Sequence, residues 1–80
     1  MPTIIIIDGF RFYFFANEND EPSHIHVQYQ SATAKFWLKP VALASNKGMK
    51  PSDLKKAGDL VRANNDLIQE KWNEFFSSKA

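Results

Sequence analysis

The fold is decided by one stretch near the start of the chain, Ile4-Ile5-Ile6-Ile7-Asp8-Gly9-Phe10-Arg11-Phe12-Tyr13-Phe14-Phe15. A β-branched run is followed by Asp8-Gly9, a dipeptide typical of two-residue hairpin turns. Beyond the turn, alternation places Phe10, Phe12 and Phe14 on one face of a strand. The stretch therefore predicts an antiparallel β-hairpin whose phenylalanine face turns towards a core.

Two further alternating segments extend this sheet, from His24 to Gln30 and from Thr33 to Leu38. A turn centred on Ser31-Ala32 between them predicts that His26 lies opposite Trp37, and that Gln28 lies opposite Lys35. No glycine is available for a primed two-residue turn, so we expect a longer loop with the same pairing.

The second half of the chain predicts an edge strand and a helix. Lys39-Pro40 breaks the preceding strand, Val41-Ala42-Leu43 is expected to form a short edge strand, and Asn46-Lys47-Gly48 a turn. Pro51 suits the first turn of a helix. Apolar residues then recur at three- and four-residue spacing as far as Phe76, and this periodicity continues through Asn64-Asn65, a pair that could kink or split the helix.

These elements predict a single α+β domain over residues 1–80, an antiparallel meander of four or five strands with one face covered by a long C-terminal helix. Strand alternation assigns side chains to the two faces. The covered face is expected to hold Phe10, Phe12, Phe14, Ile25, Val27 and Phe36. The open face is expected to hold Arg11, Tyr13, His24, His26, Gln28 and Lys35.

Composition narrows the class of protein. The chain has 80 residues, 44% of them hydrophobic, and no cysteine, which excludes a disulfide framework and thiolate metal sites. No stretch approaches the ~20 apolar residues of a membrane span, and the first residues do not resemble a signal peptide. We expect a cytoplasmic protein without a cofactor.

Residues 22–50 contain four lysines and no acidic residue, a distribution that could attract an anion or a nucleic-acid backbone.

The main chemical content is the His24-Ile25-His26-Val27 element, which follows the acidic segment 18–21. On a strand both imidazoles would face the same way. One interpretation is a metal site, with Glu18 or Asp20 supplying an oxygen ligand, although the sequence fixes no third or fourth ligand.

A second interpretation is metal-independent cleavage of RNA. One imidazole would act as base on the 2′-hydroxyl and the other as acid, while a cation stabilises the developing charge. This hypothesis assigns catalytic roles to His24, His26, Glu18 and Lys35. It assigns substrate binding to Arg11, Tyr13 and Trp37.

A third interpretation needs no catalysis. The histidines would then be polar residues on a solvent face, or a hydrogen-bonding patch covered by a partner. Tyr13, Phe15 and Trp37 beside them suit a protein interface as well as a surface on which bases stack.

Several of these motifs together resemble a bacterial family, domain of unknown function 4160. The resemblance covers essentially the whole chain and rests on Asp8-Gly9-Phe10-Arg11-Phe12-Tyr13-Phe14, Glu18…Pro22-Ser23-His24-Ile25-His26-Val27, Ala34-Lys35-Phe36-Trp37-Leu38 and Asn46-Lys47-Gly48. The family usually has Pro-Pro before the first histidine, where this chain has Pro22-Ser23. It tends to have serine at the helix cap, where Lys50 stands here, so we expect weaker capping.

The resemblance implies one component of a bacterial toxin–antitoxin module, often encoded beside a second small family, domain of unknown function 2442. By resemblance, the matching positions are Arg11, Tyr13, Glu18, His24, His26 and Lys35. The first hypothesis is a toxin-like component that acts on RNA or another nucleic-acid target and is neutralised by such a partner. The alternatives are a protein- or DNA-binding antitoxin-like module and a small metal-binding domain, and self-association is left open.

Overall fold

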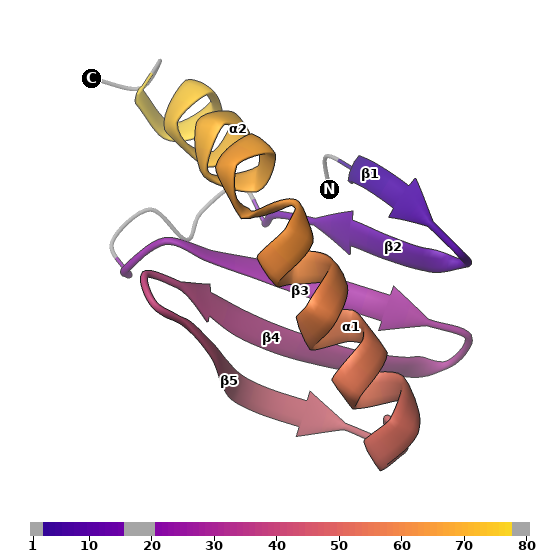
Figure 1. Ribbon diagram of the computed structural model, residues 1–80. Helices are drawn as coiled ribbons and strands as arrows, with labels where there is room; N and C mark the ends of the chain where they lie inside the picture. Colours follow the sequence, from indigo (N-terminus) through magenta and orange to yellow (C-terminus); the bar gives the residue numbers. More distant parts are fainter. Residues whose placement is uncertain (1–2, 16–20, 78–80) are drawn as a thin grey trace.

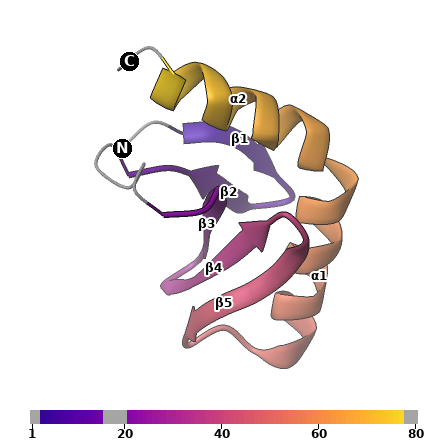
Figure 2. The same cartoon turned by 90° about the vertical axis from the view of Figure 1, so that its left-hand side faces the viewer.

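The computed structural model describes residues 3–15 and 21–77, which form one antiparallel sheet with two helices on one of its faces (Figures 1 and 2). The strands lie side by side in chain order, so the sheet is a meander. Their bounds are β1 Thr3–Ile7, β2 Phe10–Tyr13, β3 His24–Tyr29, β4 Ala32–Leu38 and β5 Val41–Lys47, and the helices are α1 Pro51–Ala63 and α2 Asn65–Ser77. The predicted α+β meander is confirmed.

The first hairpin forms as the sequence predicts. Ile7 pairs with Phe10, so β1 and β2 are joined by the two residues Asp8 and Gly9. Both have positive φ, 52° and 83° respectively, which is the backbone of a type I′ turn. A glycine at the second position adopts this conformation without the clash that a Cβ would introduce.

The prediction for the turn between β3 and β4 is wrong. Tyr29 pairs with Ala32, so the turn contains only Gln30 and Ser31, and Gln30 takes the positive φ of 55° that we expected only of glycine. The turn is therefore centred one residue earlier, and every partner on β4 changes by two positions. Because side chains alternate with a period of two, this shift leaves each side chain on its predicted face.

The corrected register changes which polar side chains are neighbours. His26 lies opposite Lys35, not Trp37, and Gln28 lies opposite Thr33, not Lys35. Trp37 lies opposite His24.

Strand β5 is longer than the predicted Val41–Leu43. It follows the two-residue break at Lys39-Pro40, which contains a cis peptide bond, and it pairs with β4 as far as Lys47. The chain turns only after the strand, where the Asn46 amide bonds both the backbone nitrogen and the backbone oxygen of Met49, at 2.9 and 3.1 Å. The extra length adds Ser45 and Lys47 to the sheet.

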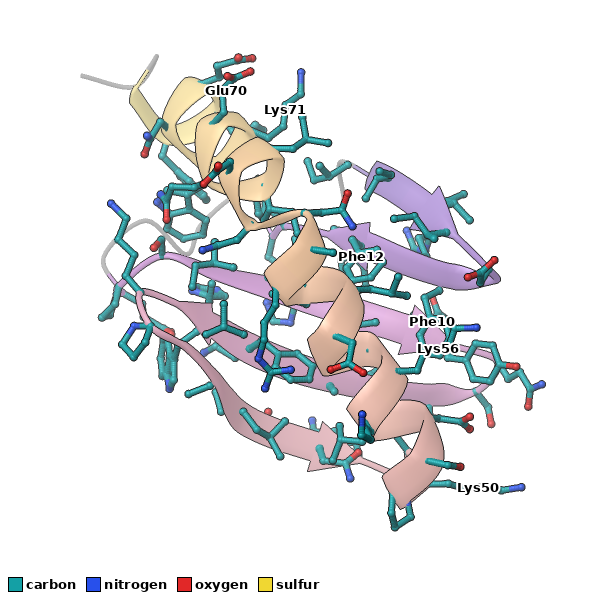
Figure 3. The ribbon with its side chains drawn as sticks, viewed as in Figure 1. Phe10, Phe12, Lys50, Lys56, Glu70 and Lys71 are labelled. Carbon is teal, nitrogen blue, oxygen red and sulfur yellow. The ribbon has the colours of Figure 1, made fainter. Side chains whose placement is uncertain are left out.

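The covered face holds the predicted core. All six residues assigned to it from the sequence are buried: Phe10, Phe12, Phe14, Ile25, Val27 and Phe36. Helix residues close over them, including Ala57 and Val61 of α1 and Ile68, Trp72 and Phe76 of α2. Figure 3 shows Phe10 and Phe12 beside α1. Lys56 of α1 lies next to Phe10, and its ammonium is 6.0 Å from the ring centroid.

The helical region divides into two helices, not the single long helix that we expected. Its break is at Asn64, whose side-chain amide donates to the Leu60 carbonyl at 2.9 Å while its backbone N–H bonds the same carbonyl at 3.0 Å. Asparagine readily competes for backbone carbonyls in this way and so ends helices. Helix α1 contacts β4 and β5, whereas α2 places Trp72 and Phe76 around Phe14. Neither helix is long and apolar enough to cross a membrane.

The start of α1 agrees with the weaker capping expected there. Pro51 occupies the first turn, and Lys50 at the N-cap makes no side-chain capping bond. Asp53 in the first turn partly compensates, because a carboxylate is favourable near the positive end of the helix dipole.

Candidate functional site

The candidate site lies on the open face of the sheet, opposite the helices (Figure 2). Strand register arranges its side chains in rows that cross the strands. The central row contains Tyr13, His26, Lys35 and Ser45. One flanking row contains Arg11, Gln28, Thr33 and Lys47, and the other contains His24, Trp37 and Ala42.

His26 is held by aromatic rings. It stacks on Tyr13, with 5.4 Å between ring centroids and 22° between planes, and it meets Phe15 edge to face at 4.6 Å. The ring of His24 lies 5.2 Å away on its own strand. His26 is only partly buried, so its ring is oriented by its neighbours and still reaches the surface.

His24 lies in the row of the open face that the strand periodicity predicts, but it is not exposed there, so the expected exposure is wrong. Its exposed fraction is 0%, and its Nδ1 donates to the Pro22 carbonyl at 2.9 Å if that nitrogen carries the proton. The ring lies 4.9 Å from that of Trp72, because α2 extends over the end of the sheet where β3 begins. A hydrogen bond from Ser23 Oγ to Gln69 Oε1, 3.0 Å long, joins the segment just before β3 to α2. His24 is thus part of the packed interior.

Arg11 is on the open face, as expected, and covers Tyr13. Its guanidinium carbon lies 4.4 Å from the Tyr13 ring centroid. The group donates to Gln28 Oε1 through Nε and Nη2, at 3.2 and 2.8 Å, and to Thr3 Oγ1 at 3.0 Å. Tyr13 lies on the open face, as expected, but only 5% of it is exposed, because Arg11 covers its ring. It forms a wall beneath Arg11.

Lys35 lies on the open face between an acid and an aromatic ring. Its Nζ is 2.6 Å from Glu21 Oε1 and 4.7 Å from the centroid of Trp37. The Lys35 side chain is 19% exposed and that of Glu21 is 40% exposed, so the pair borders solvent. Lys35 can therefore exchange its carboxylate for another anion without any change in the sheet.

A pocket of about 290 Å³ opens beside His26. Its lining consists of Tyr13, Phe15, His26, Thr33, Ala34, Lys35, Ser45 and Lys47, and none of these described residues is acidic. Thr33, Ser45 and Lys47 have no site role in the sequence prediction. Ser45 and Lys47 were missed because β5 was predicted to end at Leu43, and Thr33 because the register was displaced.

A second pocket, of about 280 Å³, lies on the other side of Lys35 along β4. Its lining is mostly apolar and consists of Pro22, Ser23, Trp37, Lys39, Pro40 and Ala42. Lys35 lines the first pocket and Trp37 forms a wall of the second. Because the Lys35 ammonium lies against the Trp37 ring, the two pockets adjoin at these two side chains.

The remaining predicted site residue, Glu18, lies outside the described residues, as does Asp20, the other candidate oxygen ligand for a metal. Within residues 3–15 and 21–77, no group of three His, Asp or Glu side chains could hold a metal ion.

Comparison with known proteins identifies the family of this chain but no individual protein that it matches. No curated protein and no solved structure is similar enough to this chain to match it. One family model matches residues 9–73, a span that contains β2 to β5, α1, most of α2 and both pockets of the open face. The chain therefore belongs to the family described as domain of unknown function (DUF4160).

Proposed function

We propose that this protein is the toxin-like component of a bacterial two-component module and that it acts on RNA through the open face of its sheet. One observation carries the proposal: the pocket beside His26 combines an imidazole, two lysines and the hydroxyl groups of Thr33 and Ser45 on one surface. Imidazole supplies general acid–base chemistry near neutral pH, and ammonium groups bind phosphate.

Within this proposal His26 is the group that meets the substrate. It lies opposite Lys35 on the neighbouring strand, so a phosphodiester in the pocket would contact both side chains. His26 would accept the proton of the 2′-hydroxyl as its oxygen bonds to phosphorus, and the lysines would stabilise the charge that develops there. The bond from phosphorus to the 5′ oxygen would break, and that leaving oxygen would take a proton from water. His24 supports His26 from the interior and does not itself reach the pocket.

A partner protein belongs to the same proposal. The family resemblance supports a small neutralising partner similar to domain of unknown function 2442. The open face, with Phe15 and Trp37 partly exposed, offers such a partner an aromatic surface.

The test is induced expression in a bacterial host, followed by purification and incubation with labelled RNA. We expect growth arrest with the wild-type chain, relief of that arrest by His26→Ala, and cleavage of RNA by the wild type alone. The matched control is Lys55→Ala, because Lys55 is a highly exposed lysine of α1 on the helical side. Growth arrest by a folded His26→Ala variant would refute the role of this histidine.

A second candidate function is favoured by the burial of His24. Cleavage by paired histidines needs two imidazoles at the substrate, and only His26 reaches the surface. A non-enzymatic module that binds nucleic acid or protein requires only the cationic and aromatic side chains of the face. Binding of RNA without cleavage, together with harmless expression, would favour this second function.

A further inference from the structure

We infer that the open face holds a subsite for one nucleotide of a single-stranded nucleic acid, with its phosphate beside Lys35 and Lys47 and its base against Trp37. The inference rests on the proposed function and deepens it, because it names the ligand unit and the residues that would bind it. It follows from two adjoining pockets of different chemistry.

The first pocket has the donors that a phosphate needs. Lys35 pairs with Ser45 and Thr33 pairs with Lys47 across β4 and β5, so two ammonium and two hydroxyl side chains form one compact group. Directly opposite side chains lie about 5 Å apart and neighbours along one face of a strand about 6.6 Å apart. A phosphate between them would receive charge-assisted hydrogen bonds from the lysines and neutral ones from the hydroxyls.

The two lysines differ in how they are engaged. Lys47 takes part in no ion pair with any other residue of the described ranges, and its side chain is exposed. Lys35, in contrast, is bound to Glu21. An incoming phosphate would therefore meet Lys47 directly and would compete with Glu21 for Lys35.

The second pocket suits a base. Trp37, Pro22, Pro40 and Ala42 give it apolar walls, and the Trp37 ring is only partly buried. Nucleobases stack on such rings with little preference for sequence. Lys35 and Trp37 are two residues apart on one face of β4, so their backbones are about 6.6 Å apart. The Lys35 ammonium lies 4.7 Å from the Trp37 ring centroid, so one nucleotide is long enough to reach both side chains.

The inference predicts that one substitution in the subsite, at Glu21, strengthens nucleotide binding. Removing its charge should tighten binding, because the carboxylate now neutralises Lys35 at 2.6 Å. Exposed ion pairs of this kind are weak, so we expect Glu21→Gln to raise the affinity for a nucleotide only about two- to fivefold.

The experiment measures fluorescence anisotropy of a labelled eight-residue oligouridylate with the full chain over a range of salt concentrations. Lys47→Ala should weaken binding and reduce the salt slope by about 0.7, the value for one phosphate contact on a single strand. Trp37→Ala should weaken binding about fivefold or more and leave the salt slope unchanged. Glu21→Gln should tighten binding, and Lys55→Ala should have no effect.

Two further measurements separate the parts of the subsite from a general loss of structure. An abasic ribose-phosphate oligomer should bind wild type and Trp37→Ala equally, while still requiring Lys47. Each variant is checked by circular dichroism and urea unfolding, and Trp37→Phe, which keeps a ring on which a base can stack, should retain most of the affinity.

The inference is overturned if wild type binds no oligonucleotide at 50 mM salt, or if Trp37→Ala and Lys47→Ala bind as wild type does. It is also overturned if these variants bind the oligonucleotide normally and lose only their binding to the partner protein, because the face would then be a protein interface. If the wild-type chain arrests growth but Trp37→Ala and Lys47→Ala both bind the oligonucleotide normally, the subsite is refuted and the toxin proposal is not. Binding that depends on Trp37 and Lys47 in a chain that neither arrests growth nor cleaves RNA would support the subsite and refute the toxin proposal.

Discussion

Replacing His24 by alanine should destabilise the fold strongly, because this imidazole is completely buried. The change removes the hydrogen bond to Pro22, worth about 1 kcal/mol. It also leaves a cavity beside Trp72, for which core truncations suggest about 1 to 3 kcal/mol more. The free energy of unfolding should therefore fall by about 2 to 4 kcal/mol, a large part of the roughly 4 to 12 kcal/mol typical of an 80-residue domain.

The assay is urea unfolding followed by tryptophan fluorescence and circular dichroism. With a slope near 1 kcal/mol per molar urea, each lost kcal/mol lowers the midpoint by about 1 M. His26→Ala is the matched control, because it removes the same group from a partly exposed position, and we expect a loss of about 1 kcal/mol. His24→Asn, which places an amide donor near the position of Nδ1, should recover the hydrogen-bond part of the loss.

A change below about 0.5 kcal/mol in His24→Ala would refute the structural role, since such values are typical of surface substitutions. The result matters for function as well. Loss of toxicity in an unfolded His24 variant would say nothing about catalysis, whereas loss in a folded His26 variant would identify the group that acts in the pocket.

Three other substitutions test the fold. Lys50→Ser should stabilise the protein by about 1 kcal/mol in thermal unfolding, because it supplies the missing side-chain cap of α1; an unchanged melting temperature would contradict this. Gly9→Ala should destabilise by about 1 to 2 kcal/mol in urea unfolding, since φ is +83° and the added Cβ would lie 3.3 Å from the Tyr29 ring; wild-type stability would contradict the turn geometry. Phe12 is fully buried, so Phe12→Ala should lower the free energy of unfolding by about 3 to 5 kcal/mol and leave little folded protein on heating. A cooperative transition near the wild-type temperature would contradict the core assignment.

The fold was largely predictable because its decisive signals are local. Asp8-Gly9 specifies a tight turn, and alternation in β2, β3 and β4 assigns the two faces without knowledge of the register. The register of β3 and β4 was not predictable, because a shift of two residues preserves every face. Only the conformation of Gln30, an uncommon positive φ for that residue type, separates the two pairings.

The candidate site was predictable only in part, because burial depends on contacts distant in the chain. Arg11 and Lys35 lie on the expected face, as the periodicity of their strands indicates. His24 obeys the same periodicity but is covered by Trp72, a residue 48 positions later in the sequence. No local pattern in β3 shows that α2 extends over this end of the sheet.

The apolar periodicity of the sequence could not predict that the helical region divides at Asn64. The apolar stripe continues through the asparagine, but the Asn64 amide bonds the Leu60 carbonyl and the helix ends. The two resulting helices then cover different parts of a twisted sheet, α1 over β4 and β5 and α2 around Phe14.

The meander order of the strands also determines when the protein can fold during its synthesis. Every strand pairs with its neighbour in the chain, so the sheet needs no distant contact, and such topologies fold quickly. Its apolar face, however, is covered by helices that are translated after all five strands, so Trp72 and Phe76 are added only when the sheet is already complete. During that interval the nascent sheet presents its phenylalanines to solvent, so the ribosome-bound chain is expected to be the species most prone to aggregate.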